Sequence, residues 1–422
     1  MKILVIGSGA REHSLVWKLG QDPGVTVIAA PGNGGIARIA QTFPVDVESA
    51  EAIVALAKRE SVDFVLVGPE APLVAGAVDA LAAAGIEAFG PSKACARLEG
   101  SKAFSKEFMA RHAVPTAAFR IFDDADEAEA FIRDANRPLV VKADGLAAGK
   151  GVVVASGTDE ALEAIDRIMR KREFGDAGAR VVVEECLRGQ EVSFHVVADG
   201  TRYLAMAPAQ DHKRIFDGDR GPNTGGMGAY SPPPVVTAEV QEKVLRTIVE
   251  PTLRGMAAEG HPFRGALFVG LMIDGDDPQV LEYNTRFGDP ECESLMTRWK
   301  GSALPLFLGS ARGDLSAVTP AWEAPASLCV VLAAGGYPAS YEKGRTIEGL
   351  DAAAALPNVV VFHAGTKLDG ENVVTSGGRV LTVTAIGDDL DKAADRAYAA
   401  VAAIHFDGMQ FRKDIGHHAR TR

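Results

Sequence analysis

Short apolar runs alternate with helical patterns along the first 100 residues of the chain. Residues 3–6, 25–28 and 64–67 have the length and the β-branched content of buried strands. Helical patterns, including residues 77–84, lie around them. Strands that alternate with helices are typical of βαβ units, so residues 1–100 are predicted to form an N-terminal α/β domain with a mainly parallel sheet.

A small α+β lobe is predicted over about residues 120–188. Residues 139–142 and 152–154 have the pattern of two paired strands, and a helical pattern over 159–172 precedes a third strand at 181–183. The small lobe therefore combines short strands with helices, unlike the parallel βαβ pattern before it.

A larger α+β lobe is predicted over about residues 189–325, so that residues 101–325 form a central region of two lobes. Its polar stretch at 210–234 is long for a compact domain, which rarely keeps more than ~12–15 structureless residues without a function. Three apolar runs and a final helical pattern predict a small C-terminal α+β domain over 326–422.

Composition excludes several classes of protein. The net charge of −12 disfavours binding to nucleic acid or to an anionic membrane. The four cysteines form no C-x-x-C pair, which suits a reducing cytoplasm. No apolar run approaches the ~20 residues needed to span a bilayer, and the first residues have the pattern of a strand, not of a signal peptide. We expect a cytoplasmic monomer or weak homodimer that binds neither nucleic acid nor membrane.

A glycine turn, Gly7-Ser8-Gly9, separates the first predicted strand from a helix. Backbone N–H groups at such a helix N-terminus favour an anion. A dinucleotide fingerprint would need a third glycine where Glu12 stands, and an acidic residue where the second strand ends at Pro31. A nicotinamide-dependent enzyme is therefore disfavoured, whereas a tight turn alone and a small phosphorylated ligand both remain open. Glycine-rich turns after two later strands favour the ligand, because ligands gather at this edge of open α/β sheets.

A second glycine-rich loop, residues 145–151, follows the strand that ends near Lys142. It is not a Walker loop, because Gly151 replaces the hydroxyl residue and a strand follows it. A lysine among apolar neighbours is costly unless it meets an anion, so phosphate is the favoured partner of Lys142. Lys150 adds charge to the loop, and Lys102 can approach from the other lobe.

Hard oxygen ligands are predicted near the end of the larger lobe. Period-two alternation places Glu282 and Asn284 on one face of a strand, a donor set that suits Mg²⁺ shared with nucleotide phosphates. Arg286, immediately beyond, fits a carboxylate or a phosphate. By contrast, we interpret the pair His417-His418 as a solvated terminus.

Distinctive stretches occur in order along the whole chain: VIGSGAREH, APGNGG, VGPE, FGPS, LEGSK, VVKADGLAAGKGV, AQDHKR, GPNTGGMGAYSP, EYNTRFGDPE and AAGGYP. On these stretches the chain resembles the ATP-grasp superfamily and, within it, the phosphoribosylamine–glycine ligase family. The resemblance implies a central two-lobed ATP-grasp region that clamps a nucleotide between the lobes. It also implies a reaction in which ATP, glycine and 5-phosphoribosylamine give glycinamide ribonucleotide, ADP and phosphate through a glycyl phosphate, the second step of de novo purine synthesis.

Three alternatives are weighed against this interpretation. Another ATP-grasp carboxylate–amine ligase of purine metabolism would share the clamp, but GPNTGGMGAYSP does not match it. Glu12 and Pro31 argue against a nucleotide-dependent oxidoreductase. Intact Lys142, Glu282 and Asn284 argue against an ATP-binding protein without catalytic activity.

The resemblance also implies roles for individual residues. The residues matched to ATP are Lys102, Lys142, Gly149, Lys150, Glu184, Glu185, Cys186, Leu187, Glu191 and Lys213. In this match Glu184 to Leu187 form the adenine connector, and Glu191 holds the ribose. Glu282 and Asn284 match the ligands of Mg²⁺ (or Mn²⁺).

The residues matched to the other two substrates are Gly9, Asn33, Glu70, Asp211, Gly226, Arg286 and Asp289. Gly9, Asn33 and Glu70 are the candidates for phosphoribosylamine. Arg286 is the candidate for the glycine carboxylate, with Asp289 near its ammonium group. The resemblance assigns Lys142, Arg286 and Asp211 to catalysis.

Overall fold

The computed structural model describes residues 1–147 and 151–420. The N-terminal domain contains a parallel sheet, which confirms the mainly parallel sheet predicted from the sequence, and its strand order is β3-β2-β1-β4-β5. The strands are β1 (Lys2–Gly7), β2 (Thr26–Pro31), β3 (Gln41–Thr42), β4 (Phe64–Val67) and β5 (Glu87–Phe89). One face packs on α2 (Ala50–Arg59), α3 (Glu70–Ala75) and α4 (Ala77–Ala83). Because helices cover both faces, β1 and β4 are almost wholly apolar.

The second face of this sheet is covered partly by segments that lie far away in the sequence. Helix α1 (Ala10–Leu19) packs there beside α11 (Glu291–Arg298) and α12 (Leu304–Arg312). Leu15, Leu295 and Phe307 share one buried cluster with Ile3 and Val5 of β1. The N-terminal domain is therefore packed against the end of the central region and is not a separate body.

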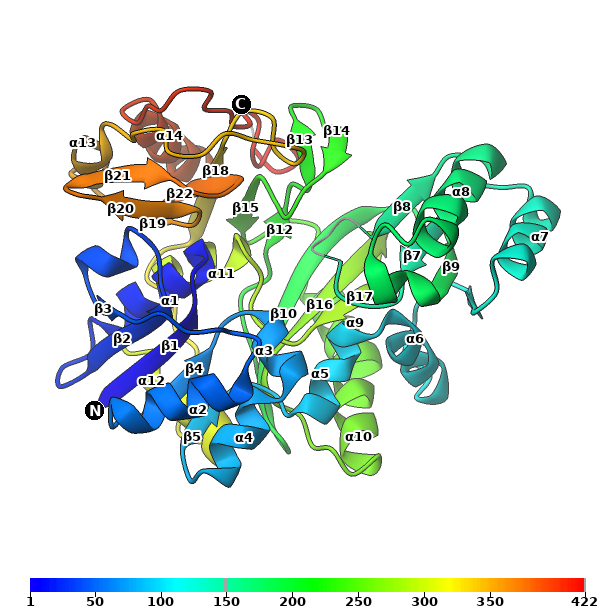
Figure 1. Cartoon of the computed structure of the whole chain (residues 1–422), viewed down its shortest axis with the longest axis horizontal. Helices are drawn as coiled ribbons and strands as arrows, with labels where there is room; N and C mark the ends of the chain where they lie inside the picture. The colour runs from blue at the N-terminus through cyan, green and yellow to red at the C-terminus, as the bar shows by residue number, and fades with distance from the viewer. Residues whose placement is uncertain (148–150, 421–422) are drawn as a thin grey trace.

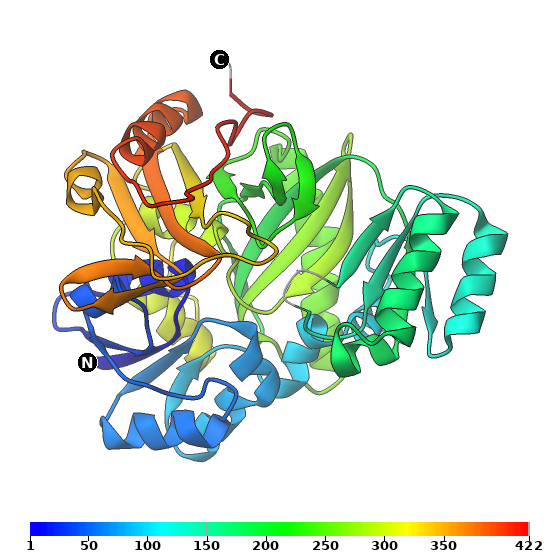
Figure 2. The ribbon, with the colours of Figure 1, turned by 45° about the horizontal axis from the view of Figure 1, so that its top comes forward.

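The small lobe projects from one end of the molecule in both views (Figures 1 and 2). Its antiparallel sheet has the order β6-β9-β7-β8. The strands are β6 (Phe119–Phe122), β7 (Leu139–Ala143), β8 (Val152–Ala155) and β9 (Val181–Glu185). Helices α7 (Ala125–Ala135) and α8 (Thr158–Ile165) complete its buried cluster. The predicted pairing of the strands on either side of the glycine-rich loop is confirmed, since Lys142 lies opposite Val152.

The large lobe contains an antiparallel sheet of order β11-β10-β16-β17. Its strands are β10 (Gln190–Asp199), β11 (Tyr203–Ala205), β16 (Arg264–Asp274) and β17 (Asp277–Asn284). Four helices share a buried cluster with this sheet: α5 (Lys93–Gly100), α6 (Lys102–Arg111), α9 (Ala238–Val244) and α10 (Glu250–Ala258).

A third antiparallel sheet, of order β12-β15-β18-β22-β19, joins the large lobe to the C-terminal segment. Its strands are β12 (Gln210–Asp211), β15 (Gly228–Ser231), β18 (Ala326–Ala333), β22 (Arg379–Gly387) and β19 (Val359–His363). The polar stretch 210–234 is therefore not structureless. It supplies two strands of this sheet and the hairpin of β13 (Arg214–Phe216) and β14 (Arg220–Asn223). The sheet spans the predicted division between 325 and 326.

The remaining elements of the C-terminal segment pack on this shared sheet or lie beside it. Helices α13 (Leu350–Ala354) and α14 (Leu390–Val401) belong to its buried cluster. The hairpin of β20 (Thr366–Asp369) and β21 (Asn372–Thr375) lies near the N-terminal domain, where Gly34 donates a hydrogen bond to the Thr366 carbonyl. Among the described residues, no helix is long and apolar enough to cross a membrane.

The close pairing of β15 with β18 predicts that a side chain at position 228 would clash with the neighbouring strand. This residue has a φ of 154°, and an added Cβ would lie 2.5 Å from the Cys329 carbonyl oxygen. Gly228→Ala is expected to lower the free energy of unfolding by about 3 kcal/mol, measured by urea denaturation.

Gly260→Ala is the matched control for this substitution. Gly260 also has a positive φ of 86°, but no described atom lies within 4 Å of its added Cβ. Its expected loss is about 1 kcal/mol, from backbone strain alone. Equal losses in the two variants would contradict a steric role for the β15–β18 contact.

Candidate active site

A buried ion-pair network lies at the junction of the two lobes. The ammonium groups of Lys142 and Lys106 each lie 2.9 Å from a different oxygen of Glu184, and all three side chains are at most 7% exposed. Lys142 also donates to the Leu281 carbonyl oxygen of β17, at 3.0 Å. The predicted phosphate-binding lysine is thus held by a carboxylate of its own lobe and by the backbone of the other.

Lys106 is a residue of this network that the sequence interpretation missed. Burial lowers its pKa to about 8, although Glu184 opposes the shift. It also donates to the Thr116 hydroxyl group at 2.6 Å. Its position on a helix could have identified it from the sequence, because Lys106 lies four residues after Lys102 on α6 and so on the same face.

The predicted adenine connector, Glu184 to Leu187, begins at the end of a strand. Glu184 and Glu185 are the last residues of β9, which pairs with β6 on one side and with β7 on the other. Glu184 is committed to the two lysines, and Glu185 pairs with Arg137 at 2.6 Å. Cys186 and Leu187 follow the strand, so the predicted segment runs from the end of β9 into the link to β10.

A second charged cluster lies on the large lobe. Lys213 forms ion pairs with Glu191 and, at 3.8 Å, with Glu282. Burial alone would raise the pKa of Glu282, but Lys213, Lys102 and Lys142 together lower it to about 2. The candidate metal ligand is therefore an ionised carboxylate surrounded by three lysines from both lobes.

Arg286 connects the end of β17 to the N-terminal half of the chain. Its guanidinium lies 3.0 Å from Glu99 and 3.4 Å from Glu70, and it donates to the Asn284 side-chain oxygen at 3.1 Å. Glu99, which the sequence interpretation missed, is buried and also accepts from the Thr285 backbone at 2.7 Å. The structure thus brings together Arg286, Glu70 and Asn284 of the predicted site.

A cavity of about 240 Å³ lies where the first glycine turn, the segment after β17 and the C-terminal domain meet. Its lining residues are Ser8, Gly9, Asp289, Tyr337, Ala364, Gly365 and Arg379. Arg379, also missed from sequence, pairs with Asp289 at 3.1 Å and donates to the Gly225 carbonyl oxygen at 2.7 Å. Two predicted substrate residues, Gly9 and Asp289, therefore share one cavity with a guanidinium group.

Asp211 lies close to this cavity, beside Gly226. A Cβ on Gly226, whose φ is 116°, would lie 2.8 Å from the nearer Asp211 carboxylate oxygen, so glycine permits this approach. Burial, with repulsion from Glu291, raises the pKa of Asp211 well above its usual value. That same oxygen has no hydrogen-bond partner among the described residues.

Two predicted ligand contacts at the first glycine turn are already used within the protein. The Gly9 N–H donates to the Glu12 carboxylate at 2.6 Å, so the anion at this helix N-terminus is a side chain of the chain itself. The Asn33 amide donates to the Ser8 carbonyl at 2.9 Å and to the His363 carbonyl at 2.6 Å. Its oxygen accepts from two backbone N–H groups. Asn33 therefore holds the turns together and offers no free amide to a ligand in this conformation.

Gly149 and Lys150 of the glycine-rich loop lie outside the described residues. Lys102, which was predicted to act with them, begins α6 and donates to the Gly145 carbonyl oxygen at 3.2 Å. It therefore lies at the start of the loop, on the side of the large lobe.

The buried network predicts a large effect for Glu184→Gln. The substitution leaves two buried ammonium groups without their carboxylate, so the pKa of Lys106 should fall below about 8. The free energy of unfolding should fall by about 3–5 kcal/mol, measured by urea denaturation.

Glu185→Gln provides the control from the neighbouring position. Glu185 and its partner Arg137 have side chains that are 39% and 51% exposed. Losing this pair should therefore cost less than about 1 kcal/mol. A similar loss in both variants would mean that Glu184 does not compensate the buried lysines.

Comparisons with known proteins cover the whole chain. Three family models match in order: the N domain of phosphoribosylglycinamide synthetase over residues 1–99, its ATP-grasp (A) domain over 100–292 and its C domain over 327–418. Phosphoribosylamine–glycine ligase of Rhizobium meliloti strain 1021 is 52% identical over 423 residues, covering 100% of this chain and 99% of that protein.

Solved structures agree with these matches. The crystal structure of phosphoribosylamine–glycine ligase from Thermotoga maritima has a TM-score of 0.86 and 33% identity, covering 99% of this chain and 100% of that one. A biotin carboxylase from Campylobacter jejuni has a TM-score of 0.76 and 15% identity, covering 98% of this chain and 93% of that one, which shows a shared fold alone. The chain belongs to the phosphoribosylamine–glycine ligase family.

Proposed function

We propose that the protein ligates glycine to 5-phosphoribosylamine at the expense of ATP, giving glycinamide ribonucleotide, ADP and phosphate. The observation that carries this proposal is the meeting of cations from both lobes around one carboxylate, in a full-length relative of named ligases. Lys142, Lys102 and Lys213 together lower the pKa of Glu282. Such a concentration of positive charge suits the phosphates of ATP and the charge that develops during phosphoryl transfer.

The ATP site would use both lobes of the central region. Lys102, Lys142 and Lys213 would hold the phosphates, and Gly149 and Lys150, which lie outside the described residues, are further candidates for binding ATP. The backbone of Glu184 to Leu187 would receive the adenine. Because Lys142 and Lys213 are paired with Glu184 and Glu191 in this conformation, ATP has to compete with those carboxylates. Glu191 would hold the ribose, since its contact with Lys213 uses only the Oε1 atom.

Glu282 and Asn284 are the residues that would hold a divalent metal ion, Mg²⁺ or Mn²⁺. The donor set fits, because Glu282 is ionised and both residues offer hard oxygens from one face of β17. The Asn284 oxygen accepts from Arg286 in this conformation, so metal binding would redirect that guanidinium. When bound, the ion would neutralise phosphate charge and polarise the γ-phosphoryl group.

Arg286 and two aspartates would position glycine. A carboxylate is a poor electrophile, so the glycine carboxylate would first attack the γ-phosphate and form glycyl phosphate. Arg286 would orient that carboxylate, since it lies beside the proposed metal ligand Asn284. Asp289 and Asp211 would face the ammonium group. The chain needs to supply alignment and charge for this step, and no protein nucleophile.

Phosphoribosylamine would bind on the N-terminal side, where its amine displaces phosphate from glycyl phosphate. The cavity lined by Gly9, Asp289 and Arg379 offers a guanidinium group for its phosphate. Glu70, with its pKa lowered by Arg286 and Arg11 against the effect of burial, remains an ionised acceptor for ribose hydroxyl groups. Asn33 would act by holding the Gly9 turn, and Gly226 by admitting the substrate close to the backbone.

We also propose a cytoplasmic location and a monomer or weak homodimer that binds neither nucleic acid nor membrane. We propose that the chain divides into three domains, at residues 1–100, 101–325 and 326–422.

Phosphate release from ATP and Mg²⁺ tests the proposed reaction. Release should require both glycine and freshly made phosphoribosylamine, and glycinamide ribonucleotide should appear in equal amount. Release with neither substrate, or only with another acid and amine, would keep the ATP clamp and reject these two substrates.

Glu282→Ala should abolish Mg²⁺-dependent turnover while the urea midpoint changes little, because Glu282 is a partly exposed carboxylate that packs no core. Gln279→Ala is the control, since Gln279 lies on the same strand, opposite Met272. It should keep near-normal turnover. Near-normal activity in Glu282→Ala would remove Glu282 from the metal site.

A further inference from the structure

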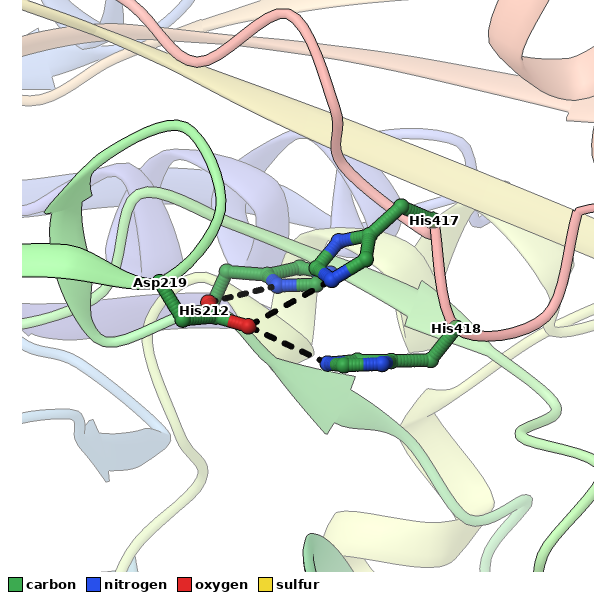
Figure 3. A group of neighbouring side chains, drawn as sticks. All are labelled: His212, Asp219, His417 and His418. Carbon is green, nitrogen blue, oxygen red and sulfur yellow. Dashed lines mark hydrogen bonds and ion pairs between the residues drawn. The ribbon is translucent and has the colours of Figure 1, made fainter.

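Four side chains from separate parts of the chain converge outside the proposed active site (Figure 3). His212 follows β12, Asp219 lies in the β13–β14 hairpin, and His417 and His418 belong to the C-terminal tail. One ligand atom from each lies within 4.8 Å of the other three. The interpretation of His417-His418 as a solvated terminus was therefore incomplete, because both imidazoles face Asp219.

The two oxygens of the Asp219 carboxylate have different surroundings. Its Oδ1 atom lies 2.6 Å from the fully buried guanidinium of Arg412 and 3.5 Å from His212 Nδ1. Its Oδ2 atom lies 3.4 Å from His417 Nε2 and 3.2 Å from His418 Nε2. The inward oxygen is thus fixed by the protein, and the outward oxygen faces two imidazoles that are 33% and 42% exposed.

The hydrogen bonds of the rings separate His417 from His212. His417 Nδ1 lies 3.0 Å from the Asp414 carbonyl oxygen, which can only accept, so this nitrogen carries the proton. In the neutral ring, Nε2 therefore presents a lone pair to the Asp219 carboxylate, and either a proton on Nε2 or a metal ion between the two atoms would make this contact favourable. Metal-ligating histidines usually donate their other N–H to such a carbonyl.

His212 has the opposite arrangement. Its Nε2 accepts from the Gly416 N–H at 2.9 Å, so the proton of its neutral ring lies on Nδ1, toward Asp219. His212 is therefore a positioning residue, which helps Arg412 to orient the carboxylate. Three ligand atoms remain: Asp219 Oδ2, His417 Nε2 and His418 Nε2.

We propose that Asp219, His417 and His418 bind a divalent transition-metal ion of the Zn²⁺ class, with solvent in the remaining position. Two imidazoles and one carboxylate are a usual donor set for this class, unlike the all-oxygen set that suits Mg²⁺. Tetrahedral bonds of ~2.0–2.1 Å place neighbouring ligand atoms roughly 3.3–3.4 Å apart. The 3.2 and 3.4 Å separations from Asp219 Oδ2 match that spacing.

Local charge is compatible with a cation at this place. Arg412 is the closest opposing charge, but it is shared with Asp414, at 2.7 Å. Asp414 also lies 3.5 Å from His417. Two carboxylates thus compensate one guanidinium, which leaves Asp219 with negative charge on its outward side. The bound ion would tie the C-terminal tail to the β13–β14 hairpin.

Metal titration of the full chain tests this site. Protein stripped with a chelator would be titrated with Zn²⁺ against a chromophoric chelator, with excess Mg²⁺ present. Co²⁺ would serve as the spectroscopic probe of coordination. About one equivalent should bind, with the intense visible absorption of a four-coordinate Co²⁺ site. His418→Gln, which changes only an exposed ring, should weaken binding by at least about tenfold, and His417→Gln should do the same.

Two control variants make the result specific. His405 is also exposed and lies 3.9 Å from a carboxylate, that of Asp407, but outside the cluster. His405→Gln and Glu282→Ala should both keep the equivalent of bound metal. Zn²⁺ should raise the thermal midpoint of the parent protein and of His405→Gln but not of His418→Gln.

Two outcomes would overturn the proposal. One is the absence of saturable Zn²⁺ binding by the stripped parent protein. The other is equal affinity in the parent and in the His417→Gln and His418→Gln variants, which would assign the ion to another place.

Discussion

The site depends on one electrostatic constraint: when no polyanion is bound, the positive charges of its lysine and arginine side chains have to be compensated by carboxylates of the protein. Four cations of the site have a carboxylate partner in this structure, whereas Lys102 donates to the Gly145 carbonyl oxygen. Glu184 holds Lys142 and Lys106, Glu191 holds Lys213, and Glu99 holds Arg286. Burying a charge without a partner is strongly unfavourable, so the carboxylates that hold the buried Lys142 and Lys106 and the largely buried Arg286 stabilise the folded chain.

This constraint also explains why the carboxylates were difficult to assign from sequence. Glu184 and Glu191 lie among residues that match an ATP site, so a direct contact with the nucleotide is the obvious interpretation. In the structure both carboxylates also neutralise lysines, and nothing in the local sequence pattern indicates this role. Lys106 and Glu99 were missed for the same reason, since each acts through a partner distant in the sequence.

Local patterns were sufficient for most of the architecture. The βαβ alternation of the first 100 residues and the strand–loop–strand around Lys142 were both predicted correctly, because they depend on periodicity and on neighbouring residues. The pairing of β15 with β18 was not predicted, because nothing in a four-residue strand specifies a partner so far along the chain. Likewise, Arg379 reaches Asp289 only once the C-terminal sheet is formed.

The shared sheet has a consequence for synthesis of the protein. Strand β15 lies between β12 and β18, and β18 begins only at Ala326. While the ribosome is still producing the intervening segment, one edge of β15 has no strand to pair with. Long-range strand pairing of this kind is slow and exposes backbone groups to other chains. Strand β15 therefore keeps one unpaired edge until about three quarters of the chain has been synthesised.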